Sequence, residues 1–155
     1  IQSTRRRISF EVMMQPTVET TLAFVSQAGE LDFAAISVTL VQKATTVRSL
    51  SHVTPSGKLP PIPSSEWCLG TGPLVLDSIN DGVNKLLSLL PNDLNKVRSI
   101  ASEFECSTHV ISRVIIYESD DRPYIELESV IMGKLSMMEA RWELDVSDLT
   151  QRKIK

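Results

Sequence analysis

The chain has 155 residues, of which 42% are hydrophobic and 23% charged, and it carries a net charge of −3. This size and balance are typical of one globular domain and exclude a fibrous repeat or a disordered chain. No apolar run approaches the ~20 residues that cross a bilayer, so we expect no membrane segment, and the acidic balance disfavours a nucleic-acid partner.

The two cysteines, Cys68 and Cys106, are the only ones in the chain. Two thiols without a Cys/His cluster make neither a zinc site nor the disulfide framework of a secreted domain. We therefore expect two free thiols, a cytoplasmic location, no metal and no cofactor.

The ends of the chain are set apart from the domain by their composition. Residues 1–17 read as an N-terminal extension, with the basic run Arg5–Arg7 and a candidate natural start at Met13–Met14. Residues 149–155 read as a polar tail. The pattern predicts a single α+β domain over residues 18–148.

The first predicted strand runs over residues 18–27, where apolar side chains recur at every second position. Asp32 is then placed to cap a short helix over residues 33–40. Residues 47–50 predict a short strand. Residues 51–65 hold five prolines and glycines, which remove backbone donors or break regular structure, so they predict an exposed loop.

The middle of the chain predicts a strand over residues 66–69 and then two helices. The first carries the clearest apolar stripe of the sequence and has Asp77 as its candidate cap. The stripe consists of Leu76, Ile79, Val83, Leu86, Leu87 and Leu90. The second helix repeats apolar residues every three or four positions over residues 94–104.

Residues 109–117 predict a β-branched strand in the centre of the sheet, because it is apolar on both faces toward its end. A helix over residues 127–138 follows, with an interruption at Gly133. A half-buried strand closes the domain. Its inward-facing side chains are predicted to be Ala140, Trp142, Leu144 and Val146.

The predicted order is β-α-β-β-α-α-β-α-β. It indicates an α+β fold with a largely antiparallel sheet and the helices on one face. The first seven elements match a ferredoxin-like split βαβ unit whose second helix is doubled, and the last two add an extra αβ unit.

The sequence contains no dinucleotide-binding, P-loop, nucleophile-elbow or zinc-protease motif. A Cys68–His52 thiolate pair is conceivable, whereas His109 at a strand start is more typical of a hydrogen-bonded structural histidine. The carboxylate pairs at residues 120–121 and 126/128 lack a basic or metal-binding partner at fixed spacing. We therefore expect no catalytic residues and no enzymatic activity.

Trp67 and Trp142 lie on different predicted strands. Both fit the pattern of core anchors that bury a large area. Trp67 also flanks the predicted loop at residues 51–65, so lining a binding groove is an alternative for this side chain.

Four segments resemble a bacterial family of domains of unknown function: Gly29–Asp32, Ser65–Leu69, Leu86–Pro91 and Leu144–Val146. The sharpest are the S-x-W-x-L and terminal L-D-V motifs, and neither is catalytic. The resemblance covers residues 18–148 and implies a small cytoplasmic α+β protein without an established activity. Small proteins of this kind often look like neighbours of contact-dependent or secreted toxin genes, and this association implies an immunity role.

These observations favour a bacterial protein-binding module, of the immunity type that inhibits a toxin. Its candidate partner-binding residues are Trp67 and the acidic turn with Glu118, Asp120 and Asp121. The alternatives are a small-ligand sensor or minor enzyme with a groove beside Trp67, and a homo-oligomeric structural protein; a homodimer is compatible with each of them.

Overall fold

The computed structural model describes residues 15–50, 64–117 and 122–150. In these parts of the chain, strands and helices follow one another in the predicted order. The elements are β1 (Thr17–Ser26), α2 (Phe33–Leu40), β2 (Thr46–Arg48), β3 (Ser65–Gly70), α3 (Ile79–Ser88), α4 (Asn95–Phe104), β4 (Ser107–Ile116), α5 (Ser129–Met137) and β5 (Arg141–Asp148). The predictions for residues 1–14, for most of the 51–65 loop and for residues 118–121 fall outside the described residues.

The described strands form one sheet in the order β2-β3-β1-β4-β5. Strand β1 pairs antiparallel with both β3 and β4, and β2 pairs antiparallel with β3. This is the strand arrangement of a ferredoxin-like split βαβ unit. Helix α5 then returns the chain so that β5 pairs parallel with β4, which is the predicted extra αβ unit. The predicted α+β fold is confirmed.

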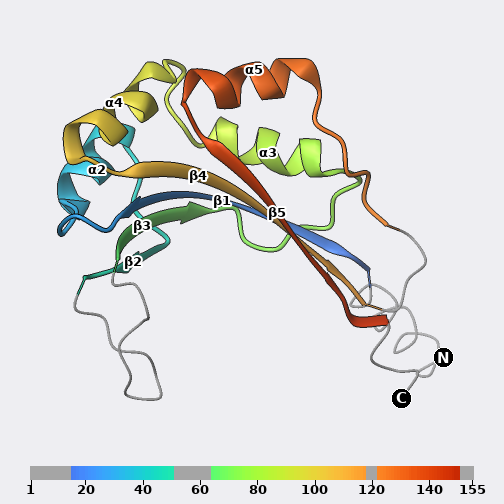
Figure 1. Cartoon of the computed structure of the whole chain (residues 1–155). Coiled ribbons are helices and arrows are strands. Elements are labelled where there is room, and N and C mark those ends of the chain that lie inside the picture. The colour runs from blue at the N-terminus through green and yellow to red at the C-terminus, as the bar shows by residue number, and fades with distance from the viewer. Residues whose placement is uncertain (1–14, 51–63, 118–121, 151–155) are drawn as a thin grey trace, which may run out of the picture.

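The helices lie on one face of the sheet, and Figure 1 shows α3, α4 and α5 along the same side of the bent strands. The alternation in β1 explains this arrangement, because Val18, Leu22 and Phe24 point to the helices and are fully buried. The intervening side chains of β1 point to the opposite face, against which no helix packs in the described part of the chain.

The helix starts show how local hydrogen bonding sets the element boundaries. Asp32 caps α2 as predicted, because its Oδ1 accepts from the Ala35 N–H at 3.0 Å. The cap of α3 is Ser78, whose Oγ accepts from the Asp81 N–H at 3.1 Å, and not Asp77. The Asp77 carbonyl instead accepts from the Tyr124 N–H at 2.9 Å, in the bend that precedes the helix.

Two details of the last αβ unit differ from the prediction. Helix α5 runs through Gly133 without a break, since glycine lowers helix stability but keeps the backbone donor. In β5, Leu144 and Val146 are 38% and 42% exposed although they point to the helix side. Figure 1 gives the reason: the far half of this edge strand runs away from the helix layer.

Cys68 and Cys106 are both free, as predicted. Within the described ranges, no helix has the length and apolar character required to cross a membrane.

Candidate functional site

The face of the sheet opposite the helices carries a hollow of about 940 Å³. Its floor is a row of neighbouring residues on four strands, in which Cys68, Ala23, His109 and Arg141 are aligned in that order. Cys68 on β3 and Ala23 on β1 are small, and in the next row Gly70 on β3 has no side chain. The hollow therefore forms where the central strands carry little side-chain volume between larger polar residues.

Carboxylates dominate the charged groups that line this hollow. They are Glu66, Glu105, Glu139 and Glu143, and the only guanidinium among the lining residues is that of Arg141. The negative charge is partly offset at the rim, because Glu66 pairs with Arg48 at 2.7 Å and Glu139 pairs with Arg98 at 3.0 Å. The Arg98–Glu139 pair is exposed, so it adds little stability and can exchange for other partners, whereas the Arg48–Glu66 pair is partly buried.

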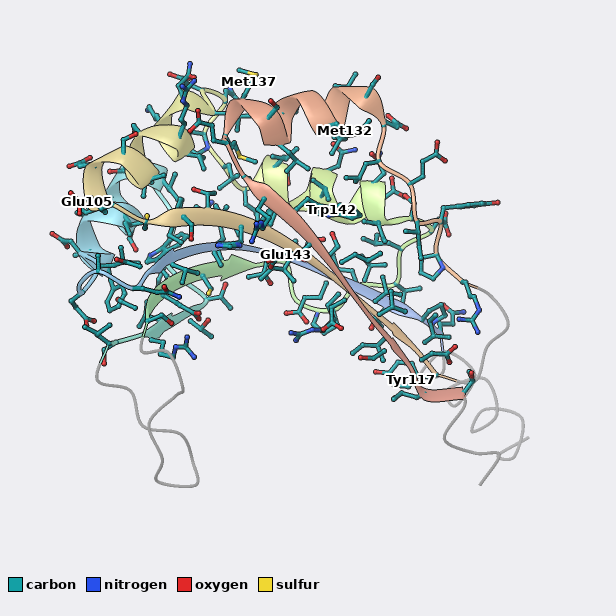
Figure 2. All side chains as sticks on the ribbon, viewed as in Figure 1. Glu105, Tyr117, Met132, Met137, Trp142 and Glu143 are labelled. Atoms are coloured by element: carbon teal, nitrogen blue, oxygen red, sulfur yellow. The ribbon has the colours of Figure 1, made fainter. Side chains whose placement is uncertain are left out.

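Glu105 and Glu139 occupy backbone positions that are unfavourable for a glutamate. Both have left-handed φ values, 51° and 53°, where glycine is the usual residue. Both also follow the C-terminal ends of helices, α4 and α5, where the helix dipole disfavours a negative charge. Figure 2 shows Glu105 at the end of α4 and Glu143 on β5. Two of the four carboxylates, those of Glu105 and Glu139, thus lie where both the backbone conformation and the helix dipole destabilise a glutamate.

A polar chain of three side chains crosses the floor from β4 to β5. Ser107 Oγ lies 2.8 Å from His109 Nε2, and His109 Nδ1 lies 3.4 Å from Glu143 Oε1. Ser107 Oγ also lies 3.2 Å from the carbonyl oxygen of Val25. His109 is therefore hydrogen-bonded, as expected for this residue, but it connects two lining residues of the hollow and is not part of the core.

Both cysteines line the hollow, and both are held in the neutral thiol form. Burial raises the pKa of the Cys106 thiol to about 11, and burial also raises the pKa of Cys68. A thiol with a raised pKa holds little thiolate near neutral pH and is a poor nucleophile. His52, the other half of the conceivable thiolate pair, lies outside the described residues.

Trp67 is packed as a core residue and presents no surface to a partner, since it is fully buried. Its indole N–H donates to Ser37 Oγ on α2 at 3.0 Å, and its ring lies 5.7 Å from that of Phe24. Trp67 is therefore a core anchor and does not line the alternative groove, while its neighbours Glu66 and Cys68 line a hollow on the other side of the sheet.

The remaining predicted site residues that the structure describes do not line the hollow. Glu118, Asp120 and Asp121 lie outside the described residues. Glu128 precedes α5, and its backbone N–H donates to Asn80 Oδ1 at 3.0 Å, so it belongs to the start of that helix. No group of three or more His, Cys, Asp or Glu residues is arranged to hold a metal ion in the described ranges.

Sequence reasoning missed Ser107, Arg141 and Glu143 as members of one site. The outward-facing positions of β5 were recognised, but their neighbours depend on the parallel register that aligns His109 with Arg141 and Ile111 with Glu143. The alternation of Ser107 and His109 on one face of a strand is the only signal that the sequence offers.

Comparison with known protein families shows which family this chain belongs to. Residues 16–149 match the family described as a domain of unknown function, DUF4279. The chain belongs to this family. No curated protein and no solved structure matches the chain. The DUF4279 match spans the whole described sheet, so the hollow lies within the family domain, and its role has to be argued from its own geometry.

Proposed function

We propose that this DUF4279 protein is a protein-binding module that receives a basic surface of its partner on the helix-free face of the sheet. The acid-rich hollow carries this proposal, with four carboxylates and one guanidinium among its lining side chains. A partner's lysine or arginine entering the hollow would find carboxylates on several sides. Opposite charge on the two surfaces would also accelerate their encounter.

The finer form of the proposal is an immunity-type inhibitor in the bacterial cytoplasm, which covers the active site of a basic toxin. An open face suits this role better than a deep cleft, because an inhibitor has to cover a partner's surface. The backbone conformation of Glu105 and Glu139 supports this role. Both residues have positive φ values that disfavour a glutamate, and such strain is typical of functional sites.

The test is the binding of a fluorescent nona-arginine peptide, followed by anisotropy at several salt concentrations. We expect the double variant Glu105→Gln, Glu139→Gln to bind several-fold more weakly than the parent chain. The difference should shrink as salt rises, because ions screen charges over about 8–10 Å at ordinary ionic strength.

The matched control removes two carboxylates elsewhere, in the variant Asp81→Asn, Glu126→Gln. Neither residue lines the hollow, and the net charge of this control equals that of the test variant. If both double variants weaken binding equally, the affinity of the peptide depends only on the net charge of the protein, and the hollow is not the binding surface.

A small-ligand sensor remains the second candidate, and the size of the hollow favours it. A volume of about 940 Å³ is within the range of small-molecule sites. The polar groups of Ser107, His109, Glu143 and Arg141 converge on one floor, as a ligand site requires. Saturable binding of a small metabolite that the peptide displaces would favour this candidate over the protein-binding role.

A further inference from the structure

The geometry points to Ser107 as a nucleophile that takes the acyl group of a carboxylic ester, with His109 as its general base and Glu143 as the residue that positions the imidazole. The order of the contacts supports these roles: hydroxyl to Nε2 at 2.8 Å, and Nδ1 to carboxylate at 3.4 Å. A hydroxyl, an imidazole and a carboxylate in this order form the arrangement that activates serine nucleophiles.

Glu143 favours one of the two neutral tautomers of His109. A carboxylate beside Nδ1 can only accept a hydrogen bond, so its position favours the tautomer that carries the proton on Nδ1. Nε2 is then left as an acceptor for the Ser107 hydroxyl. That hydroxyl has one proton, and the 2.8 Å contact to Nε2 is shorter than its 3.2 Å contact to the Val25 carbonyl. The tautomer therefore directs the proton toward the base.

The surroundings also suit an acyl group. Ser107 is exposed and lines the hollow, so an ester can reach its Oγ. Arg141 neighbours His109 in the sheet register and has no ion pair within the described part of the chain. Its guanidinium is thus available to the negative charge that develops on a carbonyl oxygen under attack.

The reaction begins when Ser107 Oγ attacks the carbonyl carbon while His109 Nε2 takes the hydroxyl proton. The ester C–O bond then breaks, His109 returns the proton to the departing alkoxide, and an alcohol leaves an acylated Ser107. Water attacks this second ester in the same way, with its proton passing through His109, and releases a carboxylic acid. No oxidant, reductant or metal is required.

This inference departs from the expectation of no catalytic residues. It depends only on three side chains and not on the proposed protein partner, so the two proposals can fail separately.

The test is covalent labelling of the whole chain with a fluorophosphonate reporter, with the labelled residue located by peptide mass spectrometry. We expect labelling at Ser107 and none in Ser107→Ala. The His109→Gln variant should label about 100-fold more slowly or worse, because a general base contributes about that factor or more. With p-nitrophenyl acetate, the parent chain should release p-nitrophenol faster than Ser107→Ala does.

Two controls separate activation from folding and from chance reactivity. Ser99 is an exposed serine on α4 whose Oγ bonds the Lys96 carbonyl, so Ser99→Ala should label like the parent. Labelling of Ser107 should slow in Glu143→Gln, which loses the carboxylate beside Nδ1, and should partly recover in Glu143→Asp, which keeps one. A merely structural role would leave the labelling rate of both variants equal to that of the parent. Equal labelling of the parent and His109→Gln, in chains with the same circular dichroism spectrum, would overturn the inference.

Discussion

Gly82 on α3 and Thr20 on β1 meet at a distance that leaves no room for a side chain. A Cβ placed on Gly82 would lie 2.7 Å from Thr20 Oγ1 and 2.8 Å from a methyl carbon of Val18. Both neighbours are fully buried and belong to a central strand, so neither can move aside easily. The glycine therefore lets α3 approach the sheet closely.

The first prediction follows from this contact. Gly82→Ala should destabilise the fold by about 1–3 kcal/mol, because overpacking outweighs the gain in helix propensity. Gly133→Ala on α5 is the matched control, since nothing lies within 4 Å of its Cβ position. That change should be neutral or stabilise by up to about 1 kcal/mol. Urea unfolding of both variants measures the difference, and a stable Gly82→Ala variant would contradict the close approach.

The second prediction separates two adjacent leucines of the α3 stripe. Leu86 is fully buried, whereas Leu87 is only partly buried against the core. Leu86→Ala should cost about 2–5 kcal/mol through lost burial and the cavity that remains. Leu87→Ala should cost clearly less. Thermal unfolding in which the two variants lose equal stability would mean that α3 is rotated from the position described above.

The strands and the helix layer could be predicted from the sequence because each depends on a local pattern. Period-two alternation indicated β1, and the leucine stripe indicated α3. The inward direction of Leu144 was also predicted, but not its exposure, because burial depends on how far the helices extend over β5. A sequence pattern reports which way a side chain points and not what covers it.

The candidate site could not be predicted from local sequence patterns. Ser107 and Glu143 lie on strands that α5 separates in sequence, and only the parallel register brings them to the same histidine. Trp67 was a candidate binding residue because it lies next to a predicted proline-rich loop. Its alternation places it on the helix face, where burial accounts for it, while its neighbour Cys68 faces the hollow.

The third prediction concerns the hydrogen bond that Trp67 makes inside the core. Ser37→Ala removes the acceptor of the buried indole N–H, and an unsatisfied buried donor costs about 1–3 kcal/mol. Ser88→Ala at the exposed end of α3 is the control, with an expected effect within about 0.5 kcal/mol. Denaturant unfolding followed by tryptophan fluorescence measures both. Equal stability of the two variants would show that the Trp67 N–H does not need Ser37.

The fourth prediction uses the Cys106 thiol as a probe of the hollow. Burial raises its pKa from an ordinary value of 9.0 to about 11, and its Sγ–H donates to the Ile100 carbonyl at 3.8 Å. Only the thiolate reacts with iodoacetamide, so a Cys68→Ala variant should alkylate slowly at pH 9 and speed up toward pH 11. In urea, the same thiol should reach half its maximal rate near pH 9.

The same shift sets the sign of a stability change with pH. Because the folded pKa lies above the unfolded one, folding favours the protonated thiol, and its contribution is fully present below about pH 9. It is lost as pH rises toward about 11, so replacing Cys106 by alanine should flatten the fall in stability across that interval. Folded Cys106 is partly exposed, so slow alkylation at pH 9 would reflect ionisation and not access alone. A half-maximal alkylation rate near pH 9 in the folded protein would show that the thiol is solvated, and that this end of the hollow is more open than its lining indicates.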